Sequence, residues 1–318
     1  MTEKIFFLGA GASREAGIPT QKELWEEIQK NYFKTGALEL KKILDFAAYL
    51  NFAKPNSNVQ TNTAELLTLI DLTLEQNSAL GKYAEKDLRR IKEILLAAIC
   101  DVLEGAVKKE RYGVLADFCQ QLTSEDCIIS LNYDTVVDHI LFDCWGAVDY
   151  GFSIEFMDEK AIFTPKEAWQ PLLLKPHGSL NWLYCARCNQ LYLLLDSSAP
   201  KSPCGLKCRR DRHPLSRVMV TPSYHKRFRV PQLHDVWRQC FARINRAQVI
   251  YFIGYSFPPG DVHIIHLIKR AVLASGHRPE IYVISPDTCG TVLKNCENIF
   301  STFYYYRTSF HDYFYGKM

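Results

Sequence analysis

The chain has 318 residues, of which 47% are hydrophobic and 23% are charged, enough for one large α/β domain or a domain with a sizeable insertion. Its formal net charge of +3 is too small to predict direct nucleic-acid binding. No stretch reaches the roughly 18 uninterrupted apolar residues of a membrane span, and the N-terminal apolar run is too short for a signal peptide. We therefore expect no membrane association and a cytoplasmic location.

A buried strand followed by a series of helices is expected in the first part of the chain. Residues 4–10 are apolar on both faces, as in a central strand of a parallel sheet. A helix is expected over 62–76, with Asn62 as its N-terminal cap. Another is expected over 87–105, where the apolar residues share one face. We interpret residues 35–125 as a helical insertion.

Short apolar strands then recur and alternate with helical stretches, notably 231–247 and 261–276. This alternation is typical of a doubly wound, mostly parallel sheet. The predicted fold class is therefore α/β, with a doubly wound, Rossmann-like parallel sheet that carries the helical insertion. The expected strands are 127–132, 172–178, 217–222, 249–256, 281–286 and 300–307.

Residues 6–20, FFLGAGASREAGIPT, place three glycines directly behind the first strand. A strand that ends at Gly9, with Gly11 and Ser13 before a helix, suits a dinucleotide pyrophosphate. Glycine lets the phosphate approach the backbone, and the helix N-terminus supplies N–H donors. The spacing departs from G-x-G-x-x-G, because the third glycine arrives late, at Gly17. A tight structural turn is the alternative interpretation.

Four of the eleven cysteines form two hooks, CARC at 185–188 and CGLKC at 204–208. In a reducing compartment this spacing predicts a tetrahedral structural zinc site. Disulfides and metal-free cysteines are the alternatives, and His213 could replace one ligand. The site would hold a small zinc-ribbon excursion over 183–214 and do no chemistry, because a closed site has no open coordination position. The predicted ligands are Cys185, Cys188, Cys204 and Cys208.

Several motifs resemble those of the sirtuins, the silent information regulator family. GAGASREAGIP at 9–19 is similar to their cofactor loop, and SLNYD at 130–134 to their T-Q-N-I-D motif. KPHGSLNW at 175–182 is similar to the segment with the catalytic histidine, and GYS at 254–256 to their G-T-S. The bacterial sirtuin-like branch is the closer match, since it also has the pattern I-G-Y-S-x-P-x-x-D found here at 253–261.

The resemblance implies a single sirtuin-like domain over 1–318 that binds NAD. Deacylating sirtuins continue G-I-P with Asp-Phe-Arg, whereas this chain continues with TQKE, and the bacterial branch lacks that element too. The resemblance therefore implies an NAD glycohydrolase of antiphage defence, which cleaves NAD as its substrate to nicotinamide and ADP-ribose. An NAD-dependent protein deacylase and a non-catalytic module that senses NAD or ADP-ribose stay open as alternatives.

Residues inside these motifs receive roles from the chemistry. Cleavage of the nicotinamide–ribose bond passes through an oxocarbenium-like sugar, so the site must orient the ribose and supply a nucleophile. Asn132 suits positioning of a hydroxyl or a water, Asp134 could accept from the nicotinamide amide, and His177 suits a general base. The expected cofactor contacts are Gly9, Ala10, Gly11, Ser13, Gly17, Pro19, Gly254, Ser256, Ser285 and Asp287.

Other polar residues near the motifs receive structural interpretations. Asp261 is expected to cap the helix that begins at Val262, with a cofactor contact as the alternative. Four histidines lie in helical or loop context without a partner motif, and we expect surface or packing roles for His139, His263, His266 and His277.

Self-association is expected, because a toxic hydrolase must be restrained and both the helical insertion and the aromatic C-terminus offer surface for it. Similar bacterial proteins occur with ATPases of the helicase type and with Argonaute proteins. The resemblance therefore implies a homo-oligomer, a defence-system partner, or both.

Overall fold

The computed structural model describes residues 3–54, 57, 59–108, 112–157, 162–163, 170–194, 206–220, 223 and 230–317, with 162–163 described by the backbone alone. The chain divides into two compact units. The first comprises residues 1–18, 107–219 and 228–318, and the second comprises 19–106 and 220–227.

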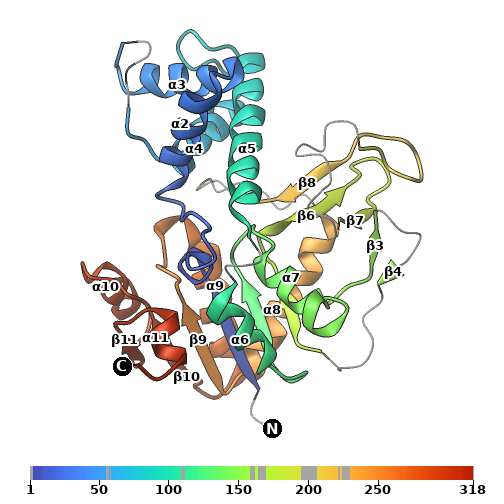
Figure 1. Ribbon diagram of the computed structural model, residues 1–318, viewed down its shortest axis with the longest axis vertical. Helices are drawn as coiled ribbons and strands as arrows, with labels where there is room; N and C mark the ends of the chain where they lie inside the picture. The colour runs from blue at the N-terminus through green and yellow to red at the C-terminus, as the bar shows by residue number, and fades with distance from the viewer. Residues whose placement is uncertain are drawn as a thin grey trace. The chain divides into compact units, whose positions relative to one another are not determined.

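The first unit is built on a six-stranded parallel sheet of β1 (Lys4–Leu8), β2 (Cys127–Ser130), β5 (Leu172–Leu174), β9 (Val249–Ile253), β10 (Glu280–Ile284) and β11 (Tyr304–Tyr306) (Figure 1). Their spatial order is β11-β10-β9-β1-β2-β5. Numbered along the chain, these six strands run 6-5-4-1-2-3, which is the strand order of a Rossmann fold. The order reverses between β1 and β9, so the ligand crevice of such a sheet lies outside the carboxyl ends of these two strands.

Helices cover both faces of this sheet: α1 (Ala10–Ser13), α6 (Gly113–Gln120), α7 (Val136–Trp145), α8 (Pro231–Arg246), α9 (Val262–Ser275), α10 (Thr291–Glu297) and α11 (Phe310–Phe314). Successive strand residues face opposite sides. On one side, the ring of Phe6 lies 5.0 Å from that of Phe118 in α6. On the other, Cys127, which is in register with Ile5, lies near Cys240 of α8. The predicted doubly wound architecture is confirmed.

A smaller sheet in the same unit consists of β3 (Ile154–Phe156), β4 (Ile162–Phe163), β6 (Gly178–Tyr184), β7 (Leu191–Leu193) and β8 (Ser216–Met219), in the order β4-β3-β7-β6-β8. The prediction that 217–222 is a strand of the parallel sheet is wrong, because β8 pairs antiparallel with β6. The apolar run alone does not show whether its neighbour in the sheet is parallel or antiparallel.

The expected strand 172–178 is two elements joined by a tight turn. The amide of Gly178 donates to the carbonyl of Lys175 at 2.9 Å, which closes the turn. Pro176 occupies its second position, where a fixed φ is favourable, and Gly178 has a φ of +83°. Because β5 ends before this turn and β6 begins within it, the turn joins the two sheets and carries His177.

The second unit is helical and contains α2 (Leu24–Thr35), α3 (Leu38–Leu50), α4 (Thr63–Glu75) and α5 (Glu85–Ala106). The predicted cap of α4 is confirmed, since the side chain of Asn62 accepts from the amide of Ala64 at 2.8 Å. The apolar face predicted for α5 is buried along its length. No helix in the described part of the chain combines the length and apolarity needed to cross a membrane.

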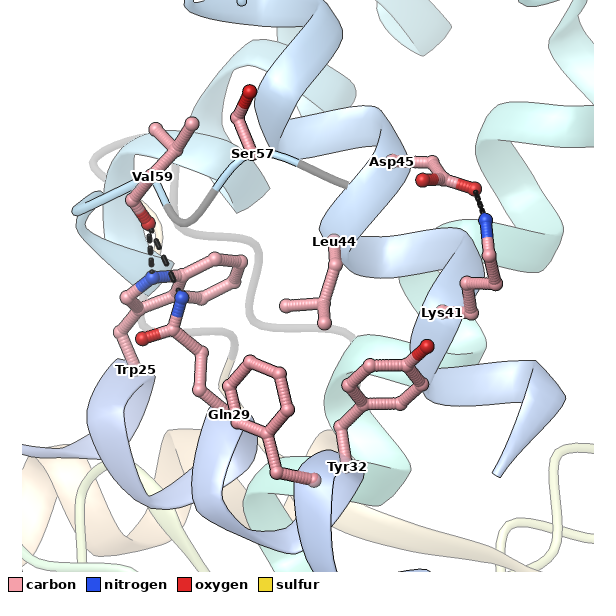
Figure 2. Close-up of a pocket in the computed structure, with 9 residues that line it drawn as sticks. Trp25, Gln29, Tyr32, Lys41, Leu44, Asp45, Ser57 and Val59 are labelled. Carbon is pink, nitrogen blue, oxygen red and sulfur yellow. Dashed lines mark hydrogen bonds and ion pairs between the residues drawn. The ribbon is translucent and has the colours of Figure 1, made fainter. Parts of the chain in front are cut away.

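A small pocket of about 140 Å³ lies in this helical unit (Figure 2). The indole of Trp25 and the amide of Gln29 both donate to the carbonyl of Val59, at 2.7 and 3.3 Å. On another side, Lys41 pairs with Asp45 at 2.6 Å. The polar side chains of α2 thus hold the segment that precedes α4 against α2.

The aromatic C-terminal segment packs on the first unit. The rings of Phe310 and Phe314 lie 5.5 and 6.3 Å from that of Phe118 in α6, and the side chain of Phe310 is buried. Part of the aromatic surface that we expected to support self-association is therefore used within the chain.

Two loops meet at the point where the strand order reverses, one after β1 and one after β9. The amide of Gly9 donates to the carbonyl of Ile253 at 3.0 Å, and that of Gly11 to the carbonyl of Gly254 at 2.9 Å. A Cβ on any of these three glycines would collide with the backbone of the opposite loop. We expected that glycines are needed here so that a phosphate can approach the backbone. The close packing of the two loops already requires glycine at these positions.

Replacement of Gly254 should therefore destabilise the fold more than replacement of Gly276, a matched control. Both residues have a left-handed φ, +60° and +74°, so each change to alanine carries a similar backbone cost of about 1 kcal/mol. Only at Gly254 does the new Cβ meet backbone atoms, which adds roughly 1–3 kcal/mol of overpacking. Denaturant unfolding of Gly254→Ala and Gly276→Ala measures the difference; equal losses would show that the two loops are not tightly packed.

Candidate active site

The loop after β1 holds most of the residues predicted to contact a cofactor. Gly9, Ala10 and Gly11 lead into the single turn of α1, and Gly17 turns the chain with a φ of +87°. Its amide donates to the carbonyl three residues earlier at 2.9 Å. Pro19 is the first residue of the second unit.

The predicted contacts on the later strands lie at the same edge of the sheet. Ser256 follows β9 and is exposed, whereas Ser285 follows β10 and is buried. Asp287 accepts from the amide of Val292 in the first turn of α10 at 2.7 Å, and from that of Cys289, which precedes the helix, at 3.2 Å. Its carboxylate therefore caps that helix, and its contact with the adenosine ribose stays a prediction.

Asn132 lies just beyond β2, and its side chain reaches the glycine loop. Its Nδ2 donates to the carbonyl of Gly9 at 3.0 Å and to the hydroxyl of Ser13 at 3.1 Å. Because a carbonyl can only accept, the first contact fixes the orientation of the amide. Both amide hydrogens are engaged, so a further contact of this side chain must be made by Oδ1 as an acceptor.

Asp134 supports Asn132 through Ser13. The hydroxyl of Ser13 hydrogen-bonds to the Asp134 carboxylate, whose Oδ1 also accepts from the amide of Val136 at 3.1 Å. Burial raises the pKa of the Asp134 carboxyl, while the charge of Lys175 opposes that change. In this arrangement Ser13 and Asp134 hold Asn132 in place, and their direct contacts with the ligand stay predictions.

His177 is 3% exposed and lies beside Asn132. Its Nδ1 is 3.2 Å from the carbonyl of Leu131, the residue before Asn132. A carbonyl accepts, so Nδ1 carries the hydrogen, and the neutral ring keeps its lone pair on Nε2. This tautomer leaves Nε2 as the atom that can take a proton.

His263 is a neighbour of His177; it packs against that ring, as a packing role predicts, and also makes a polar contact with it that was not predicted. The Nε2 atoms of the two rings are 2.8 Å apart, so the Nε2–H of His263 donates to the lone pair of His177. Trp237 of α8 places its ring 5.4 Å from that of His263 and donates to the carbonyl of Pro176 at 3.0 Å. His263 lies in the first turn of α9, directly after the motif 253–261. This position is the sequence signal that could have identified it.

Asp261 is the N-cap residue of α9, as expected, but its side chain makes no capping hydrogen bond there. Its Oδ2 accepts from the hydroxyl of Tyr255 at 3.0 Å. One of its carboxylate oxygens lies within 4.8 Å of a ring nitrogen of His177 and of His263. The cluster of these three side chains, His177–Asp261–His263, is formed at the carboxyl edge of the parallel sheet.

Lys175 is completely buried beneath the turn that carries His177. Its ammonium group donates to the backbone carbonyl of Asp134, the carboxylate of Asp138 and the hydroxyl of Ser179, each at 2.7 Å. Asp138 also accepts from the hydroxyl of Tyr150 at 2.6 Å. Three acceptors match the three hydrogens of an ammonium group, so this buried charge is fully satisfied. Nothing in the sequence pattern predicted a role for Lys175.

Three of the four predicted zinc ligands converge at one end of the smaller sheet. The Sγ atoms of Cys188 and Cys208 are 3.5 Å apart, and the Sγ of Cys185 lies 3.5 Å from a carboxylate oxygen of Asp211. These four side chains are close enough together to hold one metal ion. Cys204 lies outside the described residues.

The surroundings of Cys208 are polar. Burial opposes ionisation of this thiol, but the hydroxyl of Tyr192 and the backbone amides of Asp211 and Arg210 outweigh it and lower the pKa. His213, the alternative ligand, contributes its backbone instead, because its amide donates to the carboxylate of Asp211 at 3.0 Å.

Comparisons with known proteins found similar solved structures and one family model. A mutant Sir2 homologue in complex with ADP-ribose is 19% identical, covers 98% of this chain and 89% of its own, and has a TM-score of 0.41. A Sir2 homologue in complex with NAD is 17% identical, covers 98% of this chain and 87% of its own, with the same TM-score. No curated protein matches. The family model described as a SIR2-like domain matches residues 126–300, more than half of the chain, and the chain therefore belongs to the SIR2-like domain family.

Proposed function

We propose that this chain is an NAD glycohydrolase, which cleaves NAD to nicotinamide and ADP-ribose. The observation that carries the proposal is the meeting of Asn132 and His177 beside the glycine loop, at the edge where the strand order reverses. A doubly wound sheet binds nucleotides at that point. Membership of the SIR2-like family supports NAD as the nucleotide.

The two side chains suit the addition of water to an oxocarbenium-like ribose. When the C–N bond breaks, its electron pair leaves with nicotinamide, which is neutral, and no strong acid is needed. Asn132 would orient the water or a ribose hydroxyl by accepting at Oδ1. His177 would take the proton at Nε2, and the water oxygen would form the new bond to the anomeric carbon. The N–H of His263 must leave the lone pair of His177 before this transfer.

The loops at the reversal point would hold the remainder of NAD. The backbone from Gly9 to Gly17 suits the pyrophosphate, with Ser256 beside it. Ser285 lies on the next strand outward and suits the adenosine ribose. The glycines allow the two loops to pack, so their contribution to binding is to shape the crevice.

The cysteine cluster fits a structural zinc ion. Thiolate sulfur and carboxylate oxygen are zinc ligands. Cys185, Cys188 and Cys208 converge with Asp211, and either Asp211 or the predicted ligand Cys204 would complete a tetrahedral site as its fourth ligand. A closed site of this kind has no open position, so it would fasten the end of the smaller sheet and take no part in the reaction.

Depletion of NAD would suit an effector of antiphage defence. Such an enzyme must be held inactive until it is needed, which self-association or a partner of the ATPase or Argonaute type would accomplish. The resemblance of the motifs to the bacterial sirtuin-like branch supports this role.

Incubation of the purified chain with NAD, followed by chromatography, tests the activity. We expect nicotinamide and ADP-ribose in equal amounts without any acyl peptide. Addition of an acetyl-lysine peptide should leave the products unchanged; formation of O-acetyl-ADP-ribose would show a deacylase instead. Binding of NAD without any turnover would favour a sensing module.

Loss of either proposed catalytic side chain should stop turnover while NAD still binds. We expect Asn132→Ala to reduce hydrolysis by about 10²-fold or more, because it removes the group that orients the reactants. His177→Ala should cost about 10²–10⁴-fold, the usual range for a general base. Calorimetric NAD binding is measured beside hydrolysis, with the exposed His266→Ala as the control. Hydrolysis by His177→Ala at the wild-type rate would refute the assignment of the base.

Freshly purified protein should contain one zinc ion per chain by elemental analysis. Cys208→Ser should lose the metal and lower the thermal midpoint, because metal-binding free energy contributes to folding free energy. Cys144→Ser, which changes an exposed cysteine outside the cluster, should retain both the metal and the stability. Metal-free wild-type protein of full stability would contradict the assignment.

A further inference from the structure

The His177–Asp261–His263 cluster brings together two imidazoles and a carboxylate. One ligand atom from each side chain lies within 4.8 Å of those of the other two, and the two ring Nε2 atoms are 2.8 Å apart. His177 and Asp261 are buried, whereas His263 is partly exposed. The cluster therefore has both a protected interior and a side that solvent can reach.

Two of the three side chains are oriented as metal ligands usually are. A ligating histidine commonly donates its other ring N–H to a carbonyl, and a ligating carboxylate commonly accepts a hydrogen bond. His177 donates from Nδ1 to the carbonyl of Leu131, so its Nε2 lone pair faces the cluster. Asp261 accepts from the hydroxyl of Tyr255. These contacts fix the ligand atoms before any ion is present.

The spacing is also close to that of a metal site. Two nitrogens bound to one tetrahedral Zn²⁺ at about 2.0–2.1 Å are about 3.3 Å apart. The rings of His177 and His263 would need to separate by roughly half an ångström from their hydrogen-bonded distance to meet this geometry. The proton on Nε2 of His263 would move to Nδ1 or to solvent, and the freed lone pair would bind the ion.

We infer that this cluster is a second metal site, which takes a divalent transition-metal ion such as Zn²⁺ or Co²⁺. Imidazole favours these ions, while Mg²⁺ and Ca²⁺ prefer oxygen ligands. Three protein ligands leave a coordination position open. This site is separate from the cysteine cluster and contains no sulfur.

The consequence for activity rests on the proposed function. A metal ion bound to Nε2 of His177 occupies the lone pair that would take the proton. The ion therefore inhibits NAD hydrolysis, and its removal restores it. Binding itself does not depend on the proposed function, because it requires the three side chains alone.

Titration of wild-type protein that holds one zinc ion per chain, in the cysteine cluster, with CoCl₂ tests the binding. We expect the visible absorption of protein-bound Co²⁺ with one added equivalent, without the near-ultraviolet band of a thiolate-to-cobalt bond. Absence of this signal, or its appearance together with the thiolate band, would overturn the assignment. This measurement needs no variant, so misfolding cannot obscure the result.

Variants then identify the ligands. His263→Ala and Asp261→Asn should weaken Co²⁺ binding at least tenfold, while His266→Ala, an exposed histidine one turn further along α9, should bind as the wild type does. Thermal unfolding of each variant establishes that it is folded. Equal Co²⁺ affinity in wild type and a folded His263→Ala would refute the site.

The inhibition has its own readout. Added Zn²⁺ should inhibit NAD hydrolysis by the wild type, with recovery on chelation of the excess, and Mg²⁺ should have no effect. For each protein, inhibition is expressed as a fraction of that protein's own rate without added metal. The Zn²⁺ concentration that halves this rate should be at least tenfold higher for His263→Ala than for the wild type. If Co²⁺ binds but Zn²⁺ does not inhibit, the regulatory part is wrong. If the chain does not hydrolyse NAD, the proposed function fails, while the cobalt titration still decides the site.

Discussion

The buried ammonium group of Lys175 is the constraint on which the rest of the site depends. Removal of a charge from water is costly unless hydrogen bonds replace its hydration, and here three acceptors from three parts of the chain surround it. They belong to the segment after β2, to α7 and to β6. The ammonium can be satisfied only when all three are in place, so it ties the two sheets and α7 to the turn after β5.

The positions of the proposed catalytic side chains follow from this arrangement. Asn132 lies two residues before the carbonyl that Lys175 holds, and His177 lies two residues after Lys175 itself. The glycine loops then complete the site, because Gly9 accepts from Asn132 and packs against the loop after β9. As a result, several groups could bind to the same lone pair, that of Nε2 of His177. The N–H of His263, the proton of a reacting hydroxyl and a metal ion would compete for it.

The sequence predicted the parallel sheet and the part of the site that lies within motifs. Apolar runs revealed β1, β2, β9 and β10, and motif positions singled out Asn132 and His177. The role of Lys175 was not predictable in this way, because its partner Asp138 is 37 residues away. His263 directly follows the motif 253–261, but its contact with His177, 86 residues away, is not visible in the sequence. The smaller sheet was also missed, since an apolar run does not show with which strand it pairs.

A double-mutant comparison of the Lys175–Asp138 pair tests this account most directly. Lys175→Met and Asp138→Asn should each lose roughly 3–5 kcal/mol of unfolding free energy, because each leaves one buried charge unpaired. The double variant removes both charges of the pair and should lose much less than the sum. Its NAD hydrolysis should nevertheless stay low, since nothing then holds the carbonyl of Asp134. Additive losses of stability, or a double variant that hydrolyses NAD at the wild-type rate, would contradict the claim that this ammonium group positions the site.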